Sequence, residues 1–225
     1  MHGIDNPFWA ALDSIHADLA LRCGEVARYP AAYAPFLGVA ADGIEATEAL
    51  EQLVAPGESV YLIGAVPRVP AGWTLETFGV LAQMVRDAPL QGVDGPAIVA
   101  LSPAHRADVL ELTALVYPHY FRERTMDLGR YFGIYEDGRL AAMIGERLGT
   151  ADAREMSAIC THPDFHGRGY ARRLTAMLTN DTLAGGRLPF LHVSYVNTHA
   201  KALYERLGYR LRADVPFRSL RRAAA

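Results

Sequence analysis

The chain has 225 residues, a length that allows one large domain or two smaller lobes. Hydrophobic residues make up 51% and charged residues 21%, which excludes collagen-like, low-complexity and disordered proteins. The net charge of −3 disfavours a dedicated nucleic-acid-binding protein. The charge is uneven, because residues 1–95 carry 4 basic and 12 acidic residues, whereas residues 96–225 carry 18 and 13. A phosphorylated ligand is therefore expected on the C-terminal part.

The cysteine count and the N-terminus indicate the compartment. Cys23 and Cys160 lie too far apart in the sequence to suggest a disulfide framework or a zinc site. No basic segment followed by an apolar run opens the chain, and no apolar stretch reaches the ~18 residues of a membrane span. We expect a soluble cytoplasmic protein that binds neither a membrane nor a metal.

The N-terminal elements carry no recognisable chemical motif. Apolar residues recur at three- and four-residue spacing from Pro7 to Cys23, which predicts an amphipathic helix beginning after Asn6. A helix over Thr47–Val54 and β-like runs over 59–66 and 73–85 follow.

A segment rich in glycine and proline, residues 89–96, separates these elements from the rest of the chain. The charge balance changes sign at the same place. We therefore place a boundary there, between an N-terminal lobe (1–95) and a C-terminal domain (96–225).

The C-terminal part contains both strands and helices. Ser102-Pro103 begins a helix that reaches about Val116, and Asp137-Gly138 is a hairpin turn. The other expected elements are strands over 97–101, 131–136, 139–148 and 154–161, a helix over 169–183, a strand over 188–195, a helix over 197–207 and one or two strands over 209–220. This order predicts an α/β fold with a mixed sheet.

A loop with two glycines joins the strand over 154–161 to the helix over 169–183. Backbone N–H groups and the helix dipole converge at such a helix N-terminus, which is a geometry that binds phosphate. Gly167 and Gly169 let a ligand approach the backbone. The arginines Arg168, Arg172 and Arg173 add positive charge. The alternative is an ordinary strand-to-helix turn with glycines for packing. The loop matches neither a P-loop nor the dinucleotide-binding fingerprint.

This loop resembles the pyrophosphate loop of the GNAT superfamily of CoA-dependent N-acyltransferases, Gln/Arg-x-x-Gly-x-Gly/Ala, at His166, Gly169 and Ala171. Histidine departs from the usual Gln or Arg at the first position. A second family element is similar over Leu191–Asn197 and in the helix that carries Tyr204. The resemblance covers about residues 96–225, and residues 131–222 most resemble glycine N-acyltransferase-like members. The N-terminal lobe is then a partner without a motif, interpreted as a degenerate GNAT-like half.

The resemblance implies a GNAT fold, with acetyl-CoA or another acyl-CoA as cosubstrate and no metal. The strands over 154–161 and 188–195 would separate in a V, with the pantetheine of CoA inserted between them and paired to the backbone like an added strand. The implied cofactor-binding residues are Ile159, Cys160, Thr161, His166, Gly167, Arg168, Gly169, Tyr170, Ala171, Arg172 and Asn197.

Two residues are candidates for catalysis, since acyl transfer to an amine needs a base for the amine and an acid for the departing thiolate. Glu155, eleven positions before His166, resembles the family's general-base glutamate and would act through water. Tyr204 follows Asn197 by two helical turns, so both side chains would face the thioester sulfur, where the phenol can protonate the thiolate. The alternatives are a solvent-facing strand glutamate and a core tyrosine. Asn197 is also expected to cap the helix.

The remaining polar residues are interpreted as structural. This holds for His162, His192 and His199, and for Cys160, which we interpret as a buried strand cysteine rather than an acyl carrier. The aromatic residues of segment 117–121 lie where the family places a variable acceptor-binding segment, with plain packing as the alternative.

The predicted function is direct transfer of an acetyl or another short acyl group from acyl-CoA to a primary amine in a ternary complex. The acceptor would be a small-molecule or peptide amine, and the protein a monomer or homodimer. The alternative is a non-catalytic acyl-CoA-binding or regulatory protein. A further hypothesis gives the acidic N-terminal lobe the role of a wall that attracts a cationic amine.

Overall fold

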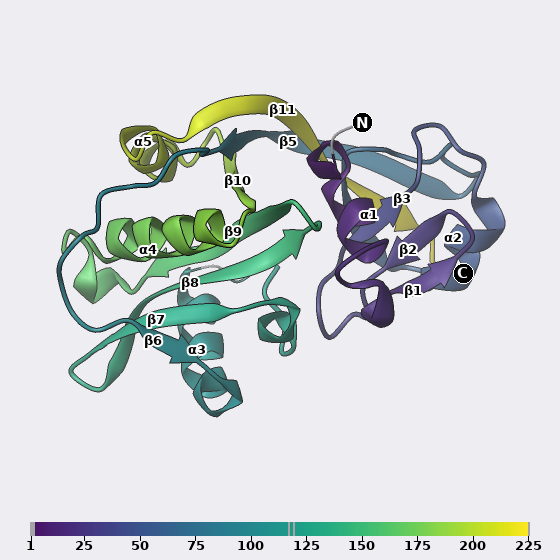
Figure 1. Cartoon of the computed structure of the whole chain (residues 1–225). Helices are drawn as coiled ribbons and strands as arrows, with labels where there is room; N and C mark the ends of the chain where they lie inside the picture. Colours follow the sequence, from purple (N-terminus) through teal and green to yellow (C-terminus); the bar gives the residue numbers. More distant parts are fainter. Residues whose placement is uncertain (1–2, 117, 119, 225) are drawn as a thin grey trace.

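One long mixed sheet runs through the molecule in the computed structural model, which describes residues 3–116, 118 and 120–224 (Figure 1). In this described part, eight strands lie in the order β4-β11-β5-β10-β9-β8-β7-β6. β9 and β10 are parallel, and the other neighbours are antiparallel. The strands are β4 (Ser59–Ile63), β5 (Trp73–Val85), β6 (Val99–Leu101), β7 (Tyr131–Glu136), β8 (Arg139–Gly149), β9 (Ala153–Thr161), β10 (Leu188–Ser194) and β11 (Arg210–Arg222). The predicted mixed α/β class is confirmed.

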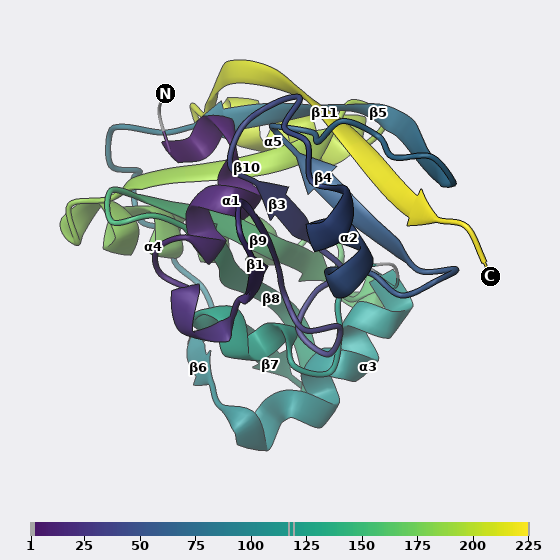
Figure 2. The same ribbon diagram turned by 90° about the vertical axis from the view of Figure 1, so that its right-hand side faces the viewer.

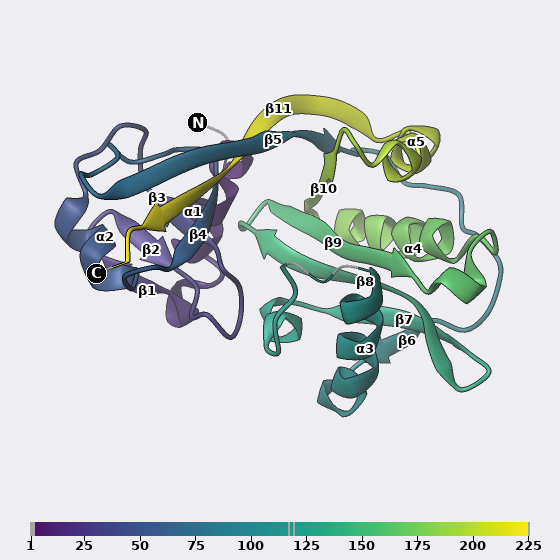
Figure 3. The same ribbon diagram turned by 180° about the vertical axis from the view of Figure 1, so that it is seen from behind.

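Helices and a small second sheet cover this sheet. α3 (Arg106–Val116) and α4 (Tyr170–Ala184) lie on opposite faces of the β7–β9 region, and α5 (Thr198–Arg206) lies at one end of β5 and β11 (Figures 1 and 3). At the other end of the molecule the chain forms α1 (Pro7–Leu12), α2 (Thr47–Leu53) and the three-stranded sheet of β1 (Leu21–Cys23), β2 (Val26–Arg28) and β3 (Leu37–Val39) (Figure 2). No helix of the described residues is long and apolar enough to cross a membrane.

Two long strands, β5 and β11, join the two ends of the molecule. They pair with each other from Trp73–Arg222 to Val85–Arg210, and β5 also pairs with β10 over Leu81–Val85. Figure 1 shows them arching from the end that holds α1 and α2 to the end that holds α5. The boundary between residues 95 and 96 stays a prediction, and the sheet includes strands from both sides of it.

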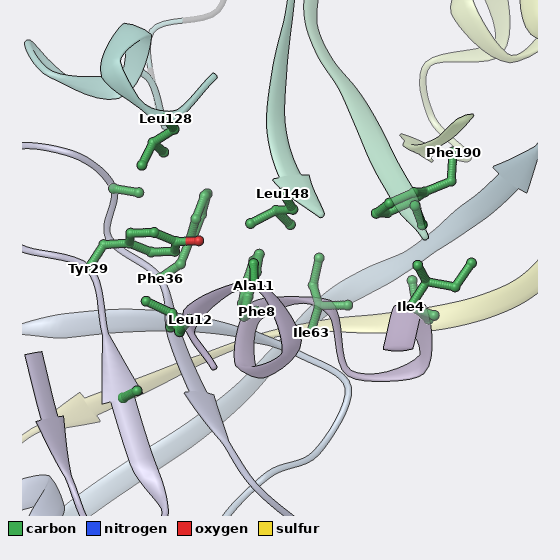
Figure 4. Close-up of a cluster of buried hydrophobic side chains, with 14 of the residues drawn as sticks. Ile4, Phe8, Ala11, Leu12, Tyr29, Phe36, Ile63, Leu128, Leu148 and Phe190 are labelled. Atoms are coloured by element: carbon green, nitrogen blue, oxygen red, sulfur yellow. The ribbon is translucent and has the colours of Figure 1, made fainter. Parts of the chain in front are cut away.

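A shared hydrophobic core lies between the N-terminal lobe and the rest of the chain. Phe8 of α1 stacks on Phe36 with ring centroids 4.4 Å apart, and both are buried. Leu148 and Phe190, at the ends of β8 and β10, belong to the same cluster of buried side chains (Figure 4). Burial of this apolar surface, at roughly 25 cal/mol per Å², stabilises the two parts as one unit.

The helix predicted from Pro7 to Cys23 is wrong in length, because α1 ends at Leu12. Its second half instead becomes a turn, the 3-10 helix Ala17–Leu19 and strand β1. β1 pairs with β2, and the side chain of His16 turns into the core, so tertiary contacts override the helical periodicity. The other predicted elements agree with the structure to within a few residues, and the C-terminal segment forms a single strand, β11.

His16 makes two hydrogen bonds, one within the N-terminal lobe and one that connects this lobe to the C-terminal part. Its Nε2 donates to the Leu128 carbonyl at 2.8 Å, so its Nδ1 accepts from the Tyr29 hydroxyl, also at 2.8 Å. The ring is 6% exposed, and this burial, despite the Leu128 hydrogen bond that opposes it, keeps the pKa of His16 below its ordinary value.

The buried imidazole should make stability depend on pH below 6.5. The unfolded chain binds a proton at His16 near its ordinary pKa of about 6.5, whereas the folded chain binds it only at a lower pH. The free energy of unfolding should therefore fall as the pH drops below 6.5, by at most about 1.4 kcal/mol per pH unit from this group. Urea titrations at several pH values should show a shallower fall for His16→Gln; parallel curves would contradict the assignment.

Candidate active site

A cavity opens in the sheet where β9 and β10 separate. The two strands pair only from Leu188–Ala153 to Phe190–Glu155, and beyond that point they diverge. A cavity of about 410 Å³ lies between them, bounded by residues 156–160 of β9 and 191–194 of β10. β9 stays paired with β8, and β10 stays paired with β5. The edges of β9 and β10 that face each other are therefore open to a ligand.

A β-bulge shapes the β9 side of this cavity. Met143 pairs with Cys160 and Gly145 with Ser157, so two residues of β9 lie opposite one residue of β8. Ala158 is one of the two, and its φ of +49° is unusual for a residue other than glycine. Such a bulge bends the strand and changes its twist, here beside the cavity-lining residues Ile159 and Cys160.

α5 supplies the opposite side of the cavity. The Asn197 side chain accepts a hydrogen bond from the Ala200 amide at 3.1 Å, which confirms the predicted helix cap. Tyr204, two turns further along, is 6% exposed and lines the cavity together with Asn197 and Ala200.

Glu155 lies at the point where β9 and β10 part, and it is fully buried. Arg147 of β8 donates from Nε and Nη2 to its two carboxylate oxygens, both at 2.9 Å, and Nδ1 of His192 lies 2.7 Å from Oε1. Burial alone would raise the pKa of Glu155, but Arg147 and His192 outweigh it and lower the pKa to about 2. Glu155 is therefore a carboxylate held by two partners.

The tautomer of His192 follows from a chain of hydrogen bonds. Gln83 Oε1 accepts from Arg212 at 2.7 Å and Gln83 Nε2 donates to the Ile4 carbonyl at 2.7 Å, which fixes the amide orientation. The same Nε2 lies 3.0 Å from Nε2 of His192 and must donate to it. His192 Nδ1 then carries the proton and donates to Glu155.

The loop after β9 has the backbone geometry expected of an anion site. Gly167 and Gly169 both have φ of +78°, and Gly169 directly precedes α4. A Cβ built at either glycine meets no other part of the chain within 4 Å, so the outer face of the loop is open. The first N–H groups of α4 have no acceptor within the helix and can bind phosphate oxygens at this face.

Several side chains of the loop already form hydrogen bonds within the chain. Arg168 and the Tyr170 hydroxyl both bind Glu136 of β7, whereas Arg172 is exposed. His166 Nε2 donates to the Thr161 carbonyl at 3.0 Å, so this carbonyl already has one partner. The groups of the loop that stay open to an anion are therefore mainly its backbone N–H groups and Arg172.

Cys160 lines the cavity as a free cysteine. Burial raises the pKa of its thiol to about 12, and since the thiolate is the nucleophilic form, the thiol is a poor nucleophile at neutral pH. Among the described residues, no group of three or more His, Cys, Asp or Glu is placed to hold a metal ion.

Comparison with known proteins identifies the family. The model of the FR47-like protein family matches residues 131–218, which include β7 to β10 and most of β11. A solved GNAT-family protein from Novosphingobium aromaticivorans is 31% identical over 100% of both chains, with a TM-score of 0.87. The chain belongs to the GNAT family.

More distant GNAT structures share the fold. A GCN5-related N-acetyltransferase-like protein from Streptococcus suis is 15% identical over 94% of this chain and 92% of its own, with a TM-score of 0.56. A GNAT-family acetyltransferase from Colwellia psychrerythraea is 14% identical over 66% of this chain and 57% of its own, with a TM-score of 0.52. No curated protein matches the chain in sequence. The predicted GNAT fold is confirmed.

This GNAT structure brings together only part of the predicted site. Five of its residues line the same cavity, namely Glu155, Ile159, Cys160, Asn197 and Tyr204. Residues 161–172 instead form the end of β9, the loop and the start of α4. Their roles stay predictions.

Several cavity residues escaped the sequence analysis. Arg147 was not singled out, and His192 was interpreted only as structural. A glutamate and a histidine within two apolar strands are a sequence signal that could have indicated this buried pair. The aromatic lining was also missed, namely Phe8, Phe36, Phe78 and Phe217. Of the aromatic segment 117–121, Tyr117 and His119 lie outside the described residues, whereas Tyr120 lines the cavity.

Proposed function

We propose that this GNAT protein is an acyl-CoA-dependent N-acyltransferase that moves an acetyl or another short acyl group directly to a primary amine. The proposal includes a ternary complex, a small-molecule or peptide acceptor and a cytoplasmic location. The finer resemblance to glycine N-acyltransferase-like members stays a prediction.

One observation carries the proposal: the strand proposed to bind acyl-CoA and the proposed catalytic acid line the same cavity. Ile159 and Cys160, on the strand that leads to the phosphate-binding loop, line one side of it, and Tyr204 lines another. The N-terminal lobe closes a third side with Phe8 and Phe36. An acyl-CoA and an amine can therefore meet in this cavity without a covalent protein intermediate, and the high pKa of the Cys160 thiol supports direct transfer.

The residues fit two parts of acyl-CoA, the pyrophosphate and the pantetheine. The open backbone at Gly167 and Gly169 suits the pyrophosphate, and the inner edge of β9 suits the pantetheine amides. The amine nitrogen attacks the acyl carbonyl, the C–S bond breaks, and the thiolate takes the proton of the Tyr204 hydroxyl. The proton lost by the amine leaves through water and restores the phenol, giving an amide and CoA thiol.

The base role of Glu155 stays a prediction, and its surroundings weigh against it. A carboxylate with a pKa of about 2 accepts a proton poorly at neutral pH, and both of its oxygens already accept hydrogen bonds. Its contacts support a positioning role instead, in which it orients Arg147 and His192 beside the cavity.

Glu155→Gln should lower the free energy of unfolding at pH 7 by about 3 kcal/mol, because it leaves the buried Arg147 without its counter-charge. The folded-state pKa lies below the unfolded value, so the deficit should shrink as the pH falls from about 4.5 towards 2. Urea titrations measure this, with the exposed Glu25→Gln as control. If stability is unchanged but the pH–rate profile loses its acidic limb, Glu155 is a base.

The function is tested by incubating the full-length protein with acetyl-CoA and a panel of primary amines while free CoA is measured with a thiol reagent. Amine-dependent release of CoA, with the N-acetyl product identified by mass spectrometry, is the expected result. If acetyl-CoA binds but no amine releases CoA, the protein is instead a non-catalytic acyl-CoA-binding protein.

A further inference from the structure

The side of the cavity away from α5 is a wall of aromatic rings. Phe36, Phe78, Tyr120 and Phe217 all line the cavity. Tyr120 stands edge-on to Phe217, with ring centroids 5.5 Å apart, and lies 6.5 Å from Phe36. Tyr61 stacks behind Phe217 at 5.4 Å. These rings come from β5, β11 and segments far apart in the sequence, so only the folded chain assembles the wall.

Phe78 is the exposed member of this wall. Its side chain is 58% exposed, although it lies 6.2 Å from Phe217 and 6.0 Å from Tyr61. The register of β5 with β11 shifts between Thr77 and Gly79, so Phe78 is the extra residue of a β-bulge. A bulge re-aims a side chain, and here it leaves a large apolar ring open beside the cavity, where a ligand can contact it.

The charges around the cavity limit the kind of amine that it can accept. Among the described residues that line it, Glu155 is the single acid; Arg147 neutralises its charge, and the hydrogen bonds from Arg147 and His192 occupy its oxygens. If the acceptor carried a second or third ammonium group, that group would lose its hydration in the cavity without gaining a carboxylate partner, which costs free energy. The hypothesis of an acidic wall that attracts cations is not supported, since this wall is aromatic.

We propose that the acceptor is a small primary amine with one amino group and an aromatic group, which seats its ring against Phe36, Phe78, Tyr120 and Phe217. Its nitrogen then points to the separation of β9 and β10, where the acyl group is presented. The proposal rests on the proposed function and names its substrate class. Aromatic rings gain from offset or edge contacts beyond simple burial, and about 410 Å³ is within the range of small-molecule sites.

The test compares four acceptors at saturating acetyl-CoA with the full-length protein: 2-phenylethylamine, butylamine, spermidine and a lysine-containing basic peptide. We expect kcat/KM for 2-phenylethylamine to exceed that for butylamine by at least about tenfold. Spermidine and the peptide should react more slowly than 2-phenylethylamine.

Phe78→Ala should lower kcat/KM for 2-phenylethylamine about tenfold, mainly through KM, and change that for butylamine less than about twofold. Its acetyl-CoA affinity and Tm should stay near those of the original protein, because the ring is exposed. Leu21→Ala removes another exposed apolar side chain of the N-terminal lobe, outside the cavity lining, and serves as the matched control.

Faster reaction of spermidine, the peptide or butylamine than of 2-phenylethylamine would overturn the substrate class while leaving N-acyl transfer in place. An equal loss for both monoamines in Phe78→Ala would overturn the aromatic seat. Release of CoA with none of the four amines, despite bound acetyl-CoA, would overturn the proposed function itself and this inference with it.

Discussion

Gly169→Glu is expected to weaken acetyl-CoA binding at least about 100-fold, which corresponds to about 2.7 kcal/mol. Gly169 directly precedes α4 and has no other part of the chain within 4 Å of the position of a Cβ. A glutamate side chain there would enter the open face of the loop and place a negative charge beside the phosphates. Isothermal titration with acetyl-CoA and with CoA measures the effect.

A control must separate this charge from backbone strain, because the φ of +78° at Gly169 penalises any side chain by roughly 1–2 kcal/mol. Gly186, just beyond the other end of α4, also has a positive φ of 70° and an open Cβ position. Gly186→Glu therefore carries a similar strain and the same charge about 22 Å away along the helix. Equal loss of binding in both variants, or tight binding by Gly169→Glu, would contradict the loop assignment.

Tyr204→Phe is expected to lower kcat about 100- to 1,000-fold and to leave acetyl-CoA affinity near its original value. The reason is that phenylalanine keeps the ring in its buried position at the cavity but has no proton for the departing thiolate. Steady-state kinetics with a saturating amine gives kcat, and titration of acetyl-CoA gives the affinity.

The matched control for this change is Tyr209→Phe. Tyr209 is buried in the same core cluster, with its ring centroid 6.2 Å from that of Tyr204, but it does not line the cavity. Its hydroxyl hydrogen-bonds to that of Thr179 at 2.6 Å, so its loss should cost about 1 kcal/mol of stability and little activity. Unchanged kcat in Tyr204→Phe would remove the acid role.

Local sequence patterns were sufficient for most of the elements and for the loop. The alternation and the turn at Asp137-Gly138 predict the β7–β8 hairpin, since a two-residue turn and its flanking strands are neighbours in the chain. The two glycines before α4 predict an anion site for the same reason, because one contiguous segment builds it. Local patterns failed where distant contacts competed with them. The helix predicted from Pro7 to Cys23 is an example, because its last residues form β1 and pair with β2.

The surroundings of the candidate site depended on contacts between distant residues. Arg147, Glu155 and His192 lie on three different strands, and their pairing lowers the pKa of Glu155, whose base role stays a prediction, to about 2. The aromatic wall likewise joins Phe36 and Phe78 to Phe217 near the other end of the chain.

By itself, the sequence determined the mixed α/β class, the glycine-containing loop before α4 and the helix that carries Asn197 and Tyr204. These features follow from neighbouring residues, whose spacing fixes which side chains share a face. Only the tertiary structure decided how far β9 and β10 separate, what charge surrounds Glu155 and that the N-terminal lobe lines the cavity with aromatic rings. Each of these depends on strand register and bulges, which are set when distant segments pair and pack.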